Sequence, residues 1–358
     1  MEINSLFWAG KKVLITGHTG FKGSWLCLWL NQMGAKIYGL SLSNPVSNPD
    51  LFSVLNLEQQ VDEKRGDIKN FDICSNTILD ADPEIIFHMA AQPLVRESYA
   101  NPLTTYNTNV IGNANILEVT RSCKSVKAIV VITTDKCYEN IEKNYAYVET
   151  DPLGGYDPYS SSKACAELVA STYYRSFFKV KGIGLATARS GNVIGGGDWS
   201  VDRLFPDAVK AWSNNEKLII RYPKATRPWQ HVLDPLSGYL VLAEHLWENP
   251  DEFSGPWNFG PDENSVKTVQ DAVELALREW GGSAEWESTN DNNLHEAGLL
   301  QLNSNKAQSM LGWKPRMDFF NAVRKTIYWY RKFYSGNLYL KKLTLNQIDK
   351  YEGEAIHA

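Results

Sequence analysis

The sequence predicts an α/β protein with a doubly wound parallel sheet and a smaller mixed α/β lobe after it. Two observations lead to this prediction. Over residues 1–190, short stretches rich in Val, Ile and Leu alternate with helical stretches, which is typical of parallel strands joined by crossover helices. A glycine-rich turn at 17–23 follows the first of these strands and opens the first helix.

The composition limits the class of protein. Of the 358 residues, 43% are hydrophobic and 22% are charged, and the formal net charge is −5. No apolar run approaches the roughly 18 residues of a membrane helix, and an acidic chain is a poor candidate for binding nucleic acid. The five cysteines form no CxxC pair, and the start of the chain lacks a signal-segment pattern. We therefore expect a cytoplasmic globular protein without a metal, membrane or nucleic-acid partner.

The elements of the first part follow one another regularly. Residues 11–17 form a short buried strand, and 21–33 form a helix that stops at Gly34. A long helix is predicted over 158–179, with Asp157 as its N-cap. The other predicted strands are 37–42, 61–67, 84–88, 126–133 and 183–188. The other predicted helices are 51–57, 70–79 and 108–123.

The alternation ends near residue 190. Further helices are predicted over 235–247, 268–280 and 319–333. We assign 1–190 to a dinucleotide-binding domain with returning segments near 230–262, 191–345 to a second domain, and 346–358 to a tail. Residues 203–227 carry a local excess of basic side chains. Because guanidinium groups suit phosphates, this segment predicts a phosphate site; a solvated face is the alternative.

The glycine turn indicates a Rossmann-type dinucleotide site. Gly17 lets the chain turn, Gly20 lets the backbone approach a pyrophosphate, and Gly23 lets the helix pack on the sheet. The helix N-terminus then faces the phosphates. A tight turn without a ligand would show the same spacing.

The nature of the dinucleotide depends on the end of the second strand. An acid that holds the ribose of NAD is expected about 20 residues after the glycines, but 38–44 contains neither an acid nor an Arg. We favour NAD and expect it to be held weakly. Asp67, at the next strand end, is a candidate partner of the adenine amino group or a simple turn residue.

A Tyr–Lys pair suggests alcohol oxidation. Tyr159 and Lys163 lie one helical turn apart. A tyrosine that acts as a base near neutral pH needs its pKa lowered by about three units, roughly 4 kcal/mol. An ammonium about 4 Å away supplies on the order of 4 kcal/mol at an effective dielectric of about 20. We therefore expect a lowered pKa for Tyr159, although an exposed helix pair has the same spacing.

The polar segment Thr134–Asp135–Lys136 follows a predicted strand, where open α/β sheets bind ligands. Together with the glycine turn and the Tyr–Lys pair, it resembles the nucleotide-sugar 4,6-dehydratases of the extended short-chain dehydrogenase/reductase family. The dTDP-glucose and GDP-mannose members have Glu where this chain has Lys136. The stretches most similar to the members that dehydrate CDP-glucose are 88–96, 154–159, 191–199 and 227–232.

The resemblance implies NAD as cofactor, CDP-glucose as substrate and a role in 3,6-dideoxysugar and O-antigen biosynthesis. It implies catalytic roles for Thr134, Asp135, Lys136, Tyr159 and Lys163. It implies cofactor contacts at Gly17, His18, Gly20, Phe21, Lys22, Gly23, Asp67, Ala90, Ala91, Tyr159 and Lys163. It implies substrate contacts at Gln92, Arg96, Asn192, Arg203, Arg227 and His295.

Several alternatives remain open at this point. A 4-epimerase would use the same cofactor and Tyr159, and a dehydratase for another nucleotide hexose would use the same turn. A non-enzymatic sensing protein would need no Tyr–Lys pair. Asp135 acts as the acid and Lys136 as the base in the family arrangement, or the two roles are exchanged. The family usually forms dimers through helices corresponding to 108–123 and 158–179, so we expect a homodimer or a dimer of dimers.

Overall fold

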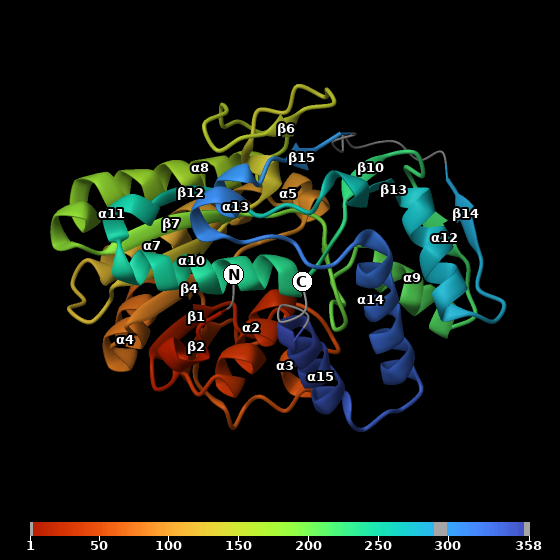
Figure 1. Ribbon diagram of the computed structural model, residues 1–358, viewed down its shortest axis with the longest axis horizontal. Coiled ribbons are helices and arrows are strands. Elements are labelled where there is room, and N and C mark those ends of the chain that lie inside the picture. The colour runs from red at the N-terminus through yellow and green to blue at the C-terminus, as the bar shows by residue number, and fades with distance from the viewer. Residues whose placement is uncertain (1–2, 290–298, 354–358) are drawn as a thin grey trace.

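The computed structural model describes residues 3–289 and 299–353 (Figure 1). A seven-stranded sheet lies at its centre, with neighbouring strands parallel throughout. In spatial order the strands are β3 (Val61–Arg65), β2 (Lys36–Ser41), β1 (Lys12–Thr16), β4 (Ile85–His88), β5 (Ala128–Ile132), β7 (Gly184–Arg189) and β12 (Gly255–Asn258). The strand order reverses between β1 and β4, which is where Rossmann-type sheets bind ligands. The predicted doubly wound parallel sheet is confirmed.

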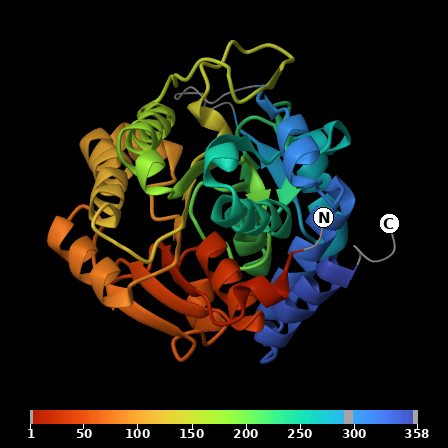
Figure 2. The same ribbon diagram turned by 60° about the vertical axis from the view of Figure 1, so that its left-hand side comes forward.

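Helices cover both faces of the sheet, as Figure 2 shows for α4, α7 and α8 on one side and α10 on the other. One layer contains α2 (Phe21–Gln32) and α10 (Leu233–Glu248), and the other contains α4 (Phe71–Ala81), α7 (Gly112–Thr120) and α8 (Pro158–Tyr173). Successive side chains of a strand point to opposite faces. Val13 and Ile15 accordingly join the core beneath α2 and α10, whereas Leu14 joins the core beneath α4, α7 and α8.

A smaller lobe lies beside the sheet, at the right of Figure 1. Its helices are α9 (Leu204–Ser213), α12 (Val269–Trp280) and α14 (Phe319–Tyr334). Its strand pairs are β9 (Leu218–Ile220) with β14 (Trp286–Ser288), and β10 (Thr226–Pro228) with β13 (Val266–Thr268). Two more pairs are β8 (Val193–Ile194) with β11 (Gln230–His231), and β6 (Ala146–Tyr147) with β15 (Gln301–Leu302). A capping box between Thr268 and Asp271 starts α12 at the predicted residue.

Some elements differ from the predictions. The expected helix 158–179 ends as α8 at Tyr173 and continues as a π-helical turn, Tyr174–Phe178. The expected helix 108–123 is a π-helical turn, Asn107–Ile111, followed by α7. The shorter helices are α1 (Ser5–Trp8), α3 (Leu51–Val54), α5 (Val95–Ala100), α6 (Pro102–Tyr106), α11 (Pro250–Phe253) and α13 (Asn305–Leu311). Within the described ranges, none of the helices has the length and apolar character that a membrane crossing requires.

The C-terminal segment forms a helix where the sequence predicted a tail. Helix α15 (Leu340–Gly353) packs against α2 and α14. The Trp29 indole donates to Glu352 at 2.7 Å, and the Tyr351 hydroxyl donates to the buried Asp234 at 2.9 Å. These contacts join residues far apart in the chain, so the polar local sequence does not reveal them.

Candidate active site

The glycine turn joins β1 to α2 at the point where the strand order reverses. Gly17 has a φ of 74°, and a Cβ atom on it would lie 2.8 Å from the backbone nitrogen of Ala90. A Cβ on Gly23 would lie 2.2 Å from the carbonyl oxygen of Gly17. Both positions therefore require glycine. The turn leads directly into the N-terminus of α2, where a pyrophosphate-binding turn places its ligand.

His18 is buried beneath the second strand. Its Nδ1 pairs with the Ser41 hydroxyl at 3.0 Å, and its Nε2 pairs with a Glu63 carboxylate oxygen at 2.7 Å. A Cβ on Gly39 would lie 2.5 Å from the same ring. Burial lowers the pKa of His18, and Glu63 opposes this shift only in part. Glu63 was missed by the sequence analysis because it lies on β3, next to the strand end where an acid was sought.

Lys22 extends from the first turn of α2 toward the catalytic end of the site. Its Nζ donates to the hydroxyl groups of Ser190 at 3.0 Å and Tyr239 at 3.3 Å. Burial lowers the pKa of Lys22 to about 7, and the positive charges of Arg203 and Lys163 contribute to this shift. Lys22, Lys163 and Arg203, which are far apart in the chain, thus lie close enough to influence one another's charge.

The Tyr–Lys pair lies on the buried face of α8. The Asp157 carboxylate accepts the Ser160 amide at 2.9 Å, which starts the helix as predicted. Tyr159 and Lys163 are both buried, so the alternative of an exposed helix pair is wrong. The Lys163 Nζ donates to the Ile132 carbonyl at 3.2 Å, and burial lowers the pKa of this lysine to about 8.

The prediction of a lowered pKa for Tyr159 is wrong. Burial raises the pKa of Tyr159 to about 12, and a hydrogen bond with Thr134 and the charge of Arg203 oppose this rise only in part. The sequence argument counted the attraction of Lys163 but left out the cost of burying a phenolate. Tyr159 therefore needs additional positive charge, or a proton transfer concerted with the oxidation, to act as a base near neutral pH.

The turn after β5 brings the next predicted residues together. The Thr134 hydroxyl donates to Asp135 Oδ1 at 2.9 Å and accepts the Lys136 amide at 3.4 Å. Asp135 is buried, and its Oδ2 has no hydrogen-bond partner in the part of the chain that the structure describes. A Cβ on Gly191 would lie 1.8 Å from this oxygen. Any side chain at position 191 would therefore clash with the Asp135 carboxylate. The Oδ2 atom of this carboxylate is available to a ligand.

Arginines from both domains face two carboxylates at the lobe side. Arg203 Nη1 lies 3.4 Å from Asp198 Oδ2. Asp202 Oδ1 lies 3.0 Å from Arg221 Nη1 and 3.9 Å from Nε of Arg96, which comes from α5. The acidic partners were missed because loop residues carry no periodic signal. The predicted basic segment thus forms ion pairs rather than a purely solvated face.

The remaining predicted residues lie in different surroundings. Asp67 accepts the amide two residues later at 2.9 Å, the contact expected of a turn residue. The Gln92 side chain hydrogen-bonds within its own loop and to α6. Asn192 has a φ of 48°, and Arg227 lies on β10. His295 lies outside the described residues.

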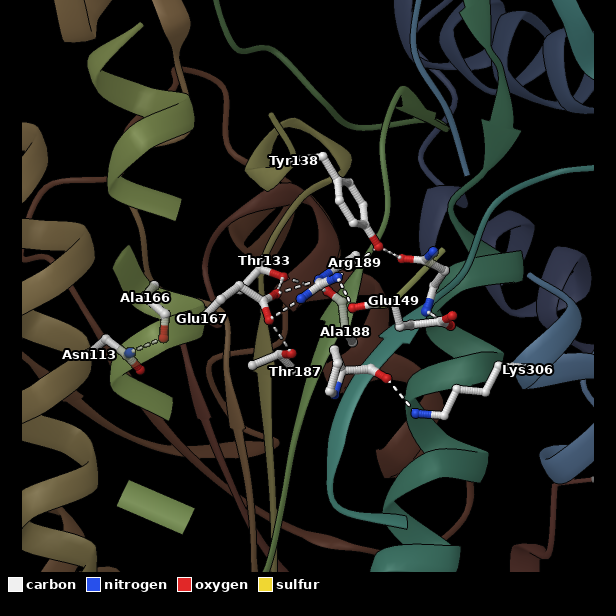
Figure 3. Close-up of polar contacts among 12 residues, drawn as sticks. Asn113, Thr133, Tyr138, Glu149, Ala166, Glu167, Thr187, Ala188, Arg189 and Lys306 are labelled. Carbon is white, nitrogen blue, oxygen red and sulfur yellow. Dashed lines mark hydrogen bonds and ion pairs between the residues drawn. The ribbon is translucent and has the colours of Figure 1, made fainter. Parts of the chain in front are cut away.

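One buried pair near the site was not predicted. Glu167 on α8 and Arg189 at the end of β7 form an ion pair at 2.8 Å (Figure 3). Glu167 follows Lys163 by four residues, so the helical period already placed the two on one face. Arg189 could be recognised only once the strand was known to end beside α8.

Comparison with known proteins identifies the family. The family model described as GDP-mannose 4,6 dehydratase matches residues 14–326. The chain belongs to this family. It is 48% identical over 339 residues to the CDP-glucose 4,6-dehydratase of Salmonella typhimurium, covering 93% of this chain and 94% of that protein.

Members of known structure share the fold. The dTDP-glucose 4,6-dehydratase of Bacillus anthracis, in complex with NAD, has a TM-score of 0.74 at 25% identity and covers 89% of this chain and 96% of that chain. The UDP-glucuronic acid 4-epimerase of Bacillus cereus, in complex with UDP-glucuronic acid and NAD, has a TM-score of 0.76 at 22% identity. The match covers 90% of this chain and 99% of that chain. The predicted family membership is confirmed.

Proposed function

We propose that this protein is an NAD-dependent CDP-glucose 4,6-dehydratase that forms CDP-4-dehydro-6-deoxy-D-glucose and water. The 48% identity to a CDP-glucose 4,6-dehydratase over nearly the whole chain carries this proposal. The positions that require glycine at 17 and 23 fit a bound dinucleotide. Bound NAD would accept the C4 hydride and later return it to C6 of the same sugar.

The buried side chains supply the proton transfers. Tyr159 takes the proton of the sugar 4-hydroxyl, and the Thr134 hydroxyl turns from Asp135 Oδ1 to donate its hydrogen bond to the 4-oxygen. Lys163 keeps positive charge near this oxygen, because its pKa of about 8 leaves most of it protonated at pH 7. The resulting ketone makes the C5 hydrogen acidic. Loss of the C5 proton and of the 6-hydroxyl then releases one water, and C5 regains a proton when the hydride is returned to C6.

Asp135 and Lys136 divide the elimination between them. We propose that Asp135 protonates the leaving hydroxyl and that Lys136 removes the C5 proton. The buried Oδ2 of Asp135 supports the first role, because this oxygen has no hydrogen-bond partner among the described residues and is available to the sugar. Exchange of the C5 hydrogen with solvent tests the assignment. Lys136→Met should abolish the exchange and Asp135→Asn should retain it; the reverse result exchanges the two roles.

The arginines of the lobe side hold the substrate. We propose that Arg203 and Arg227 bind the diphosphate and that Arg96 and Asn192 contact the same ligand.

Free thiols on all five cysteines, each within the described residues, fit a reducing compartment such as the cytoplasm.

We further propose a homodimer through α7 and α8. Ile111 and Leu168, next to and on these helices, expose 50% and 57% of their surface, which suits a covered apolar face. Sedimentation of the wild type and of Leu168→Glu tests the dimer, since a charge on that face should produce monomers.

Isotope labelling tests the reaction itself. CDP-glucose deuterated at C4 should give a product deuterated at C6, with little crossover between labelled and unlabelled molecules. A 4-epimerase, the second candidate because UDP-hexose 4-epimerases share this fold, would return deuterium to C4. An ordinary dehydrogenase would release the label in free NADH. Either outcome would overturn the proposal.

A further inference from the structure

A buried ion pair joins Glu167 on α8 to Arg189 on β7, and Figure 3 shows it with the side chains that it contacts. The side chains of Arg189 and Glu167 are 2% and 3% exposed. Arg189 Nε donates to Glu167 Oε1 at 3.0 Å, and Nη2 donates to Oε2 at 2.8 Å. A fully buried pair is weak evidence for stability, because desolvation offsets much of the attraction. Its role therefore has to be sought in what it holds in place.

Two threonines complete the contacts of the carboxylate. The Thr133 hydroxyl donates to Glu167 Oε1 at 2.5 Å, and the Thr187 hydroxyl donates to Oε2 at 2.6 Å. Each carboxylate oxygen thus receives two hydrogen bonds, one from Arg189 and one from a threonine. Charge-assisted bonds of this kind leave the side chain a single geometry.

The pair contacts both ends of the proposed catalytic turn. Thr133 directly precedes Thr134, and Tyr138 closes the short helical turn that follows. Arg189 Nη1 donates to the Tyr138 hydroxyl at 2.7 Å, and its guanidinium carbon lies 4.7 Å from the centre of the Tyr138 ring. The Tyr138 hydroxyl in turn donates to Asn258 on β12 at 2.8 Å. The turn at 134–137 is therefore held from both sides by one buried group.

The same carboxylate belongs to the helix that carries the Tyr–Lys pair. Glu167 follows Lys163 by one turn and Tyr159 by about two turns, so the three side chains share one face of α8. A displacement of Glu167 would therefore move the catalytic turn relative to this helix.

We propose that the Glu167–Arg189 pair positions the catalytic residues by holding the turn at 134–137 against the first turns of α8. Neither side chain needs to touch the substrate, and both are positioning residues. The inference rests on the catalytic roles proposed above for Thr134 and Tyr159. Hydride and proton transfers tolerate little displacement, since an error of about 1 Å can cost about 100-fold in rate.

The decisive variant is the double substitution Glu167→Met/Arg189→Leu. Apolar side chains of similar size in place of a buried ion pair usually preserve the fold, whereas Glu167→Gln alone leaves the arginine charge uncompensated. In the double variant we expect kcat for CDP-glucose to fall about 100-fold, with KM changed by less than about threefold. A double variant that folds and retains kcat within about threefold would overturn the proposal.

Hydrogen exchange gives a reading that does not depend on the reaction. Peptides covering 134–138 should lose protection in the double variant, while peptides from α10 should not. Unchanged protection at 134–138 would also overturn the proposal. If the wild type fails to dehydrate CDP-glucose but the double variant shows this local loss, the proposed function fails and the positioning role stands.

Thr133 and Thr187 form a matched pair of controls. Both are buried, and each donates one hydrogen bond to the same carboxylate, but only Thr133 adjoins the catalytic turn. Thr133→Val and Thr187→Val should lower the unfolding temperature similarly. Thr133→Val should lower kcat about tenfold, and Thr187→Val should change it by less than about twofold. Equal effects on kcat would show a purely structural role and would sink the proposal.

Discussion

Four arginines near the proposed active site fall into two groups that differ in their access to water. Arg189 and its partner Glu167 are almost fully buried. The side chains of Arg96, Arg203 and Arg221 are 31%, 35% and 27% exposed. Removing one partner of a buried pair is strongly destabilising, whereas an exposed pair contributes about 0–1 kcal/mol. The buried pair is therefore permanent, while a diphosphate can displace the exposed Asp202 carboxylate from its pairs with Arg96 and Arg221 at small cost.

This difference matches the two tasks of the site. The catalytic end must present Tyr159, Thr134 and Asp135 in a fixed geometry, and their backbone is tied to the central sheet. Under the proposed function the lobe end admits and releases a charged substrate, so its cations are better held by an exposed, exchangeable partner such as Asp202. Variants at the two ends should accordingly affect kcat and KM differently.

The largest expected effect comes from Tyr159→Phe. The variant lacks the group that we propose takes the alcohol proton, and kcat should fall about 10³- to 10⁴-fold. The buried ring still fills its place, so the unfolding temperature should change little. Steady-state kinetics and calorimetry on one preparation check both expectations. Normal turnover would refute the assigned base.

Arg203→Met should act on KM rather than kcat. Hydrogen bonds to charged groups contribute about 1.5–3 kcal/mol, so KM for CDP-glucose should rise about 10- to 100-fold. Lys210→Met, which removes an exposed cation from α9, the helix that follows Arg203, is the matched control and should change KM by less than about twofold. A fall in kcat with unchanged KM would contradict the contrast between the two ends.

The cofactor should dissociate readily during purification. The end of β2 carries no acid for the ribose, and the Glu63 carboxylate on the adjacent strand already pairs with His18 and with Arg65 at 2.8 Å. We expect dialysed protein to be partly free of NAD and to gain activity when NAD is added. A stoichiometric cofactor that survives dialysis would show that other contacts replace the missing acid.

The pKa of Lys163 predicts the alkaline limit of activity. Burial lowers this pKa to about 8, so the ammonium is lost as the pH rises through that value. If catalysis needs the charge, kcat should decline above pH about 8. Lys163→Arg keeps its charge at every accessible pH. Its residual activity should therefore lack this decline, and a profile of unchanged shape would exclude Lys163 as the titrating group.

The sequence predicted what depends on local spacing. The glycine turn, the cap at Asp157 and the one-turn separation of Tyr159 and Lys163 are local patterns, and the structure contains all three. It could not predict features that require the fold. Arg189 acquires its partner only when β7 lies beside α8, and the raised pKa of Tyr159 follows from burial.

Asp202→Asn should show the smallest effect. It is the most direct test of the exposed arginines, because Asp202 pairs with two of them. Asp202 has a φ of 59°, a conformation that Asn tolerates, so the backbone should be undisturbed. Under the function proposed above, its carboxylate competes with the substrate for Arg96, and it also pairs with Arg221. An exposed ion pair contributes about 0.2–1 kcal/mol. Because the variant does not have to break this pair when the substrate binds, its KM for CDP-glucose should fall about 1.4- to 5-fold.

The salt dependence separates this competition from other causes. The difference in KM between the wild type and Asp202→Asn should shrink at high ionic strength, because salt screens exposed ion pairs in both proteins. Asp62→Asn removes the same charge from an exposed site on β3 and should leave KM unchanged. A rise in KM for Asp202→Asn would mean that Asp202 orients the arginines for the diphosphate. The lobe end would then be as preformed as the catalytic end, and the contrast between the two groups of arginines would be lost.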